Sequence, residues 1–172
     1  PKSNATKCIP VQEGFYQSGP TTEVECPAGK AGRGGNATCH DCKVGSYQDL
    51  SGNTTCRECP SGFGNKAIGS TACNGVPPGS YSWNGEVREC KAGHYCTGEA
   101  VNQTACNPGS YATRPKSISC IECAPGTYAA LFGTISCKDC DPDSYQPKSN
   151  ATKCLPVQEG FYQSGPTTEV EC

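Results

Sequence analysis

Cysteine is the residue of this chain with the most chemistry open to it, and it occurs 16 times in 172 residues. Residues 39–59 and residues 120–140 each hold four cysteines with the spacing C-x2-C-x13-C-x2-C, which resembles a four-cysteine zinc site. A single C-x-x-C pair is also the spacing of thioredoxin-like redox sites. Zinc binding, thiol redox chemistry and disulfide formation are therefore the three chemistries to weigh.

Disulfide formation fits these cysteines best. Val11, Val76 and Val157 stand where the second cysteine of the C-x-x-C motif is expected, so a zinc site would lack a ligand at three places. Redox C-x-x-C sites need a βαβ context, and the chain has no such pattern. We therefore predict disulfides, with no metal and no cofactor.

Other combinations of reactive residues are weaker. Asp139, Asp141 and Asp143 resemble the opening of a calcium loop, but Ser144 replaces its glycine and Asn150 replaces its last glutamate, which favours solvated turn carboxylates. His40 and His94 are far apart in the sequence, and no phosphate-loop, nucleophile-elbow or zinc-protease motif occurs. We predict that the chain is not an enzyme and has no catalytic residues.

The chain repeats itself on two scales. Residues 1–26 and 147–172 match at 25 of 26 positions, which gives a period of 146 residues. Within the period, modules of about 17 residues follow the pattern C-x-x-C-x-x-G-x-Y-x8-C. The modules are 8–26, 26–39, 39–56, 56–73, 73–90, 90–106, 106–120, 120–137, 137–154 and 154–172. We interpret residues 1–172 as one continuous array and expect it to be an excerpt of a longer one.

The spacing of the cysteines predicts how they pair. Five pairs are separated by 14 residues and one by 13, and each would close a hairpin-like loop. With Cys90 left for Cys96, the predicted disulfides are Cys26–Cys39, Cys42–Cys56, Cys59–Cys73, Cys90–Cys96, Cys106–Cys120, Cys123–Cys137 and Cys140–Cys154. Cys8 and Cys172 remain, and we predict disulfides from them to neighbouring periods. Cys90–Cys106 with Cys96–Cys120 stays an alternative, because spacing alone does not fix connectivity.

The composition predicts the fold class. Gly, Pro and Cys number 21, 14 and 16, whereas Leu, Ile, Val and Phe together number 20, too few for a single apolar core. We predict a small disulfide-rich fold of β-hairpins and turns with little or no helix, in which tandem modules build an elongated, solenoid-like rod. One tyrosine per module is expected to lie against the neighbouring disulfide and module as a thin spine, with its hydroxyl in water. The glycine two residues before it is expected to take a positive φ.

Charge and hydropathy exclude two kinds of partner. The net charge is −2 and no basic block occurs, which argues against nucleic-acid binding. No apolar run approaches the roughly 20 residues of a transmembrane helix, so we expect no membrane span in this segment.

Five N-x-S/T sequons predict N-linked glycans. They lie at Asn4, Asn36, Asn53, Asn102 and Asn150. Each precedes the cysteine that closes its module by a few residues, in the exposed second half of a loop. Glycans there would cover and solubilise a thin rod.

The module pattern resembles the ephrin-receptor-like cysteine-rich repeats, which are related to tumour necrosis factor receptor and EGF-like modules. The similarity is clearest over residues 39–73 and 106–154, where CKVGSYQDLSGNTTCREC and CAPGTYAALFGTISCKDC follow it most closely. The three valine-containing modules and the short module 26–39 depart from it. The resemblance implies an extracellular, disulfide-bonded, elongated chain without catalytic residues.

Two functions follow from these patterns. The first is a structural repeat unit of a glycosylated extracellular fibril or cell-surface filament, whose partners are neighbouring copies of itself, head to tail. The second is the stalk of an extracellular receptor or adhesin ectodomain. The near-identical copies favour the first, because receptor modules usually diverge in sequence.

Overall fold

The computed structural model describes residues 10–35 and 38–172. These residues form twenty short β-strands and no helix, so they contain no helix that could cross a membrane. The chain divides into two compact units. The first contains Pro1–Gly75 and Asn84–Val87, and the second contains Val76–Trp83 and Arg88–Cys172.

The strands pair in chain order as two-stranded sheets. In the first unit, antiparallel pairs join β1 (Phe15–Gly19) to β2 (Thr22–Glu25), β3 (Lys30–Ala31) to β4 (His40–Asp41), β5 (Ser46–Tyr47) to β6 (Arg57–Glu58) and β7 (Phe63–Gly64) to β8 (Asn74–Gly75). Two further strands are β9 (Ser80–Trp83), which belongs to the second unit, and β10 (Glu86–Glu89).

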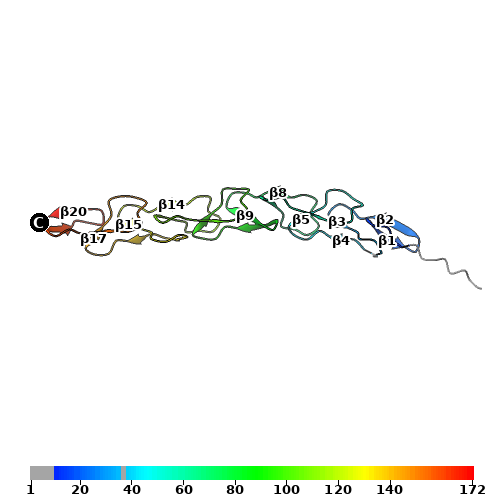
Figure 1. The fold of residues 1–172 in the computed structure, drawn as a ribbon, viewed down its shortest axis with the longest axis horizontal. Coiled ribbons are helices and arrows are strands. Elements are labelled where there is room, and N and C mark those ends of the chain that lie inside the picture. The colour runs from blue at the N-terminus through cyan, green and yellow to red at the C-terminus, as the bar shows by residue number, and fades with distance from the viewer. Residues whose placement is uncertain (1–9, 36–37) are drawn as a thin grey trace, which may run out of the picture. The chain divides into compact units, whose positions relative to one another are not determined.

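The second unit continues the same pattern. Its antiparallel pairs join β11 (His94–Tyr95) to β12 (Thr104–Ala105), β13 (Ser110–Tyr111) to β14 (Ile121–Glu122), β15 (Thr127–Tyr128) to β16 (Lys138–Asp139), β17 (Ser144–Tyr145) to β18 (Leu155–Pro156) and β19 (Phe161–Gln163) to β20 (Glu169–Glu171). Within each unit the hairpins follow one another in chain order (Figure 1). The predicted fold of disulfide-rich hairpin modules in tandem, without helix, is confirmed.

Most hairpins begin at the module glycine, whereas the hairpin of β17 and β18 begins at Asp143. At Gly109 the backbone turns with φ +89°, which an L-residue rarely adopts and glycine tolerates, so the predicted positive φ is confirmed. The next two residues pair as Ser110 with Glu122 and Tyr111 with Ile121. The amide of Cys123 then donates to the carbonyl of Gly109 (2.8 Å), which closes the hairpin beside the cysteine.

The interior consists of sulfur and small side chains. Cys26, Cys42, Cys90, Cys106 and Cys123 are fully buried, whereas the largest apolar side chains, such as those of Leu131 and Phe132, are exposed. Neither unit therefore has an extended apolar core within the described residues, and the cross-links take over its role.

The tyrosines, which are predicted to lie against the disulfides with their hydroxyl groups in water, are in most modules partly buried. Most of the tyrosines are only half-buried, and Tyr162 is exposed; Tyr81, which packs with Cys90 and Cys96, is the exception. The residue immediately after the tyrosine is buried instead. Successive side chains of a strand point to opposite sides, so only one of these two positions can face the interior.

Candidate functional site

The structure joins fourteen cysteines into seven disulfides. The pairs are Cys26–Cys39, Cys42–Cys56, Cys59–Cys73, Cys90–Cys96, Cys106–Cys120, Cys123–Cys137 and Cys140–Cys154. These are the pairs derived from the spacing, and the alternative pairs Cys90–Cys106 and Cys96–Cys120 are not formed. Cys172 is an exposed free thiol, and Cys8 lies outside the described residues.

The residues weighed for metal binding are dispersed. The zinc-like set in residues 39–59 is divided among three different disulfides. Asp139 lies in β16, and Asp143 takes the place of the module glycine with φ +65°. Across residues 10–35 and 38–172, no three His, Cys, Asp or Glu side chains gather in a way that could hold a metal ion.

Three of the five sequons can be placed. Asn102 is exposed, and its Oδ1 accepts from the amide of Gln103 (2.9 Å). Asn53 is half-buried, with its Nδ2 directed at Oε1 of Gln48 (3.3 Å) and at the Leu50 carbonyl (3.4 Å). Asn150 is exposed and takes φ +57°. Asn4 and Asn36 lie outside the described residues.

The most regular feature of each unit is a set of main-chain contacts between successive modules. We call the glycines that carry it the stacking glycines: Gly14, Gly29, Gly45, Gly79, Gly93, Gly109 and Gly126. At six of them the amide donates to a carbonyl of the next module over 2.6–2.8 Å: Gly14 to Gly32, Gly29 to Gln48, Gly79 to Cys96, Gly93 to Ala112, Gly109 to Ala129 and Gly126 to Gln146. At Gly45 the side-chain Oδ1 of Asn65 replaces the carbonyl (2.9 Å).

The acceptor of that bond is the buried residue after the tyrosine position, which we call the buried slot. The slot holds Gly32, Gln48, Asn65, Cys96, Ala112, Ala129 and Gln146. Its own amide donates to a loop further along the chain, as from Gln48 to Ser70 (3.1 Å) and from Ala129 to Ala151 (3.0 Å). Its occupants are small or carry an amide, and this signal is visible in the sequence, although the sequence analysis missed it.

A third bond runs back from the loops to the buried cysteines. The donors are loop residues in the left-handed region: Gly52 to Cys26, Gly69 to Cys42, Lys116 to Cys90, Gly133 to Cys106 and Asn150 to Cys123, over 2.7–2.9 Å. These loop residues also lie against the stacking glycine two modules before them, as Gly69 lies on Gly29 and Gly133 on Gly93. These modules are therefore in contact with the next module and with the second module after it.

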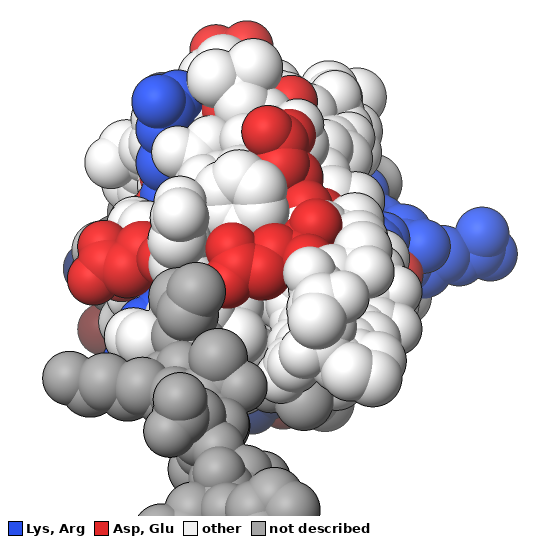
Figure 2. Space-filling view, turned by 90° about the vertical axis from the view of Figure 1, so that its right-hand side faces the viewer, with Lys and Arg blue, Asp and Glu red and all other residues white. Residues whose placement is uncertain are grey.

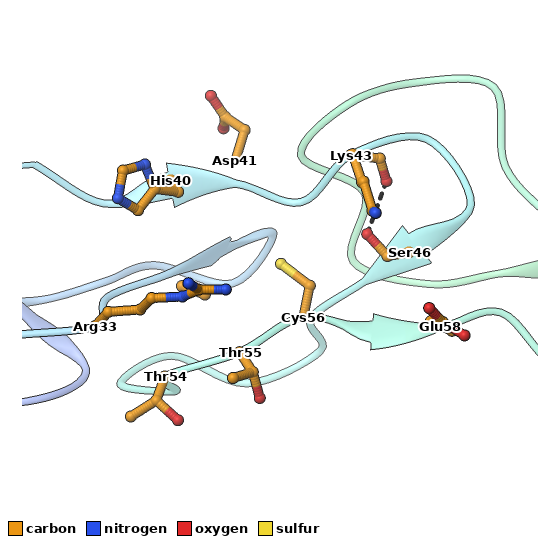
Figure 3. Close-up of a pocket in the computed structure, with 10 residues that line it drawn as sticks. Arg33, His40, Asp41, Lys43, Ser46, Thr54, Thr55, Cys56 and Glu58 are labelled. Carbon is orange, nitrogen blue, oxygen red and sulfur yellow. Dashed lines mark hydrogen bonds between the residues drawn. The ribbon is translucent and has the colours of Figure 1, made fainter.

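A pocket of about 550 Å³ lies in the first unit. Its lining includes Arg33, Lys43 and Glu58, with Thr54 and Thr55 of the Asn53 sequon (Figure 3). Cys56 in its wall is bonded to Cys42, and Ser46 Oγ donates to the Lys43 carbonyl (2.8 Å), so neither side chain is an activated nucleophile.

Residues 29–75 match the family described as tyrosine-protein kinase ephrin type A/B receptor-like. This segment contains three of the seven disulfides and the same stacking contacts as the rest of the chain. The match at residues 29–75 and the spacing of the disulfides fit ephrin-receptor-like cysteine-rich repeats. Ephrin-receptor-like repeats are disulfide-rich, extracellular in type and typically non-enzymatic. No curated protein matches the chain.

Proposed function

We propose that this chain is a structural repeat unit of a glycosylated extracellular fibril or cell-surface filament. The observation that carries the proposal is the stacking contact, in which a glycine amide of one module donates to the next module, to a carbonyl at six positions and to Asn65 Oδ1 at Gly45. A contact that each module makes with the following modules has no natural end, so it can be continued by any further copy of the repeat.

The materials of the contact support a structural role. Main-chain atoms, glycine and disulfides form it, so the exposed side chains contribute little to it. Seven closed loops within the described residues resist unfolding by limiting the unfolded chain, at roughly 3 kcal/mol for a loop of about 15 residues. The near-identical copies at residues 1–26 and 147–172 suit such an assembly, with Cys8 and Cys172 in inter-period disulfides and N-glycans on the surface.

Electron microscopy of the native material tests this proposal. A filament with a constant axial repeat is expected, together with a mass loss after enzymatic removal of N-glycans. A short monomeric particle, or a mass unchanged by the glycosidase, would contradict it.

Exposed apolar side chains in the second unit favour the stalk of a receptor or adhesin as a second candidate. These are Ile118, Ile121, Leu131, Phe132 and Ile135, each more than half exposed. Such side chains can contribute to a binding surface. This function predicts a membrane anchor and a distinct head in the full-length gene, whereas a fibril subunit predicts many further copies of the period.

A further inference from the structure

One sequence of 17 residues occurs twice in the chain without any difference, as residues 10–26 and as residues 156–172. The first copy is followed by residues 27–53 of the same unit, and the second copy ends at Cys172. The two copies therefore show the same residues with and without a following module.

The first copy is docked on the residues that follow it. The amide of Gly14 donates to the carbonyl of Gly32 (2.7 Å), and the amide of Gly52 donates to the carbonyl of Cys26 (2.8 Å). The amide of Gly35 donates to Val11 (3.1 Å). The disulfide Cys26–Cys39 fixes the arrangement, and Gly14 and Cys26 are both buried.

The same groups are open in the second copy. Around Gly160, which corresponds to Gly14, no atom lies within 4 Å of the place where a Cβ would stand. Cys172, which corresponds to the fully buried Cys26, is an exposed free thiol. Among the described residues, the Gly160 amide has no hydrogen-bond acceptor comparable to Gly32.

Other groups of the second copy are already hydrogen-bonded to the preceding module of the same unit. Tyr145 donates its hydroxyl to Glu169 (2.7 Å), Gln163 donates to the Ser144 carbonyl (2.8 Å), and Gln146 donates to the Pro166 carbonyl (3.0 Å). The groups left open on residues 156–172 are thus different from the groups that hold this segment to the preceding module.

The first copy presents the other half of this relationship. Glu23, which corresponds to Glu169, is exposed together with Glu13 and Glu25. Acidic side chains gather on the surface seen from this side of the molecule (Figure 2). In the second copy, Glu169 accepts a hydrogen bond from Tyr145 of the preceding module. The exposed Glu23 can accept the same bond from the equivalent tyrosine of a preceding copy.

We propose that residues 156–172 form a docking surface for residues 27–53 of a second copy of the repeat, continuous with Cys172 in one polypeptide. The inference rests on the proposed function and specifies the contacts by which one period is joined to the next. Gly160 donates to Gly32 of the following copy, Gly52 of that copy donates to Cys172, and Cys172 forms a disulfide with its Cys39. Residues 156–172 contain every group that residues 10–26 use in these contacts, because the two 17-residue segments are identical.

Continuity of the chain decides between this occupant and a separate molecule. In a separate molecule, residues 10–26 are already bonded to Gly32, Gly35, Cys39 and Gly52, as they are in the first unit. Docking from outside would have to displace an identical, covalently attached segment, which the high effective concentration of that segment opposes. A copy that follows Cys172 directly has no such competitor.

The disulfide step needs a named oxidant. The thiols of Cys172 and of Cys39 in the following copy lose two protons and two electrons as the S–S bond forms. A small-molecule disulfide accepts them, and oxidised glutathione becomes two molecules of reduced glutathione.

An extended chain tests the proposal directly. It consists of residues 1–172 followed without a linker by a second copy of residues 27–75, refolded with reduced and oxidised glutathione. We expect the Cys172 thiol to become inaccessible to alkylation and to be found by peptide mapping in a disulfide with Cys39 of the second copy. The amide of Gly160 should exchange with solvent about 100-fold more slowly than in the 172-residue chain. A reactive Cys172, or an unchanged exchange rate at Gly160, would overturn the proposal.

Two variants separate docking from local strain. Gly160→Val would place a side chain where Gly14 meets the backbone of Gly52 in the docked copy, and should abolish the gain in protection in the extended chain. Gly165→Val has a positive φ and open space as well, and should leave that gain intact. Both variants are also measured in the 172-residue chain, so that strain common to the two chains cancels. An equal loss of protection in the two extended variants would contradict the docking surface, whereas filaments in the native material depend on neither result.

Discussion

Gly109 lies directly against the main-chain carbonyl of Asn150, a residue of the second module after it. The same relationship holds between Gly29 and Gly69 and between Gly93 and Gly133. Gly29 and Gly93 thus meet main-chain atoms of the later module, whereas at Gly109 the side-chain Oδ1 of Asn150 lies as close as its carbonyl. The contact explains why the position needs glycine for two independent reasons, a positive φ and the absence of a Cβ.

Replacing one stacking glycine should therefore cost more than strain alone. Gly109→Ala would put a Cβ into the Asn150 carbonyl, and we expect it to lower the free energy of unfolding by about 3 kcal/mol. Gly165→Ala is the matched control, because its φ of +102° is strained but its surroundings are open. It should cost only about 1 kcal/mol. Denaturant unfolding of the oxidised proteins measures both values, and equal losses would contradict a steric role for the glycine.

The buried slot should be sensitive where it holds an amide. Gln48 is 2% exposed, and its side chain donates to the Thr55 carbonyl (2.7 Å) and accepts from the Leu50 amide (3.2 Å). Gln48→Ala removes both partners and leaves a cavity, so we expect a loss of about 2–3 kcal/mol in denaturant unfolding. Gln17→Ala changes the corresponding exposed residue of the first described module and should cost less than about 0.5 kcal/mol.

Peptide mapping under non-reducing conditions should distinguish the two pairings of the irregular module. Cleavage after Glu89, Lys91 and Glu99 separates Cys90 from Cys96, and Cys96 from Cys106. The structure predicts that the short peptide containing Cys90 remains attached to residues 92–99. If the peptide containing Cys90 is attached instead to the peptide containing Cys106, the alternative pairing is correct and the structure of the β11–β12 hairpin is wrong.

The sequence predicts the cross-links of this fold better than its contacts. Regular spacing is enough to pair Cys106 with Cys120 because the loop between them has one length in most modules. The recurring tyrosine draws attention to its own position, and Tyr111 does pair across the hairpin with Ile121 and stays half-exposed, but the buried residue is its neighbour Ala112. The stacking contact itself could not be predicted, because it joins main-chain atoms that every residue possesses.

Tyr145 should lose its proton at a higher pH than an ordinary tyrosine. Its hydroxyl donates to Glu169, and this hydrogen bond, with burial and the carboxylate charge, raises the pKa of Tyr145 above its usual value near 10. The bond therefore stabilises the folded protein at a pH below about 10, and this contribution is lost as the pH rises through the higher pKa that Tyr145 has in the folded protein. Ultraviolet titration of tyrosinate should show one step at lower pH in Glu169→Gln. Superimposable curves for the two proteins would contradict the assignment, and Tyr145→Phe identifies the step.

The proposed N-glycans should be released enzymatically from the folded protein faster at Asn102 than at Asn53. Glycosylation occupies the Nδ2 atom, which in Asn53 is directed inward at the buried Gln48, whereas Asn102 is exposed and uses only its Oδ1 in a local bond. A glycosidase must reach that linkage, so the half-buried site requires local opening first. We expect a difference of about 10-fold or more in the rate of release, followed by mass spectrometry of the glycopeptides. After reduction and denaturation the two sites should be released at the same rate. Equal rates in the folded protein would show that the Asn53 loop opens freely, which would argue against the hydrogen bonds that Gln48 makes there.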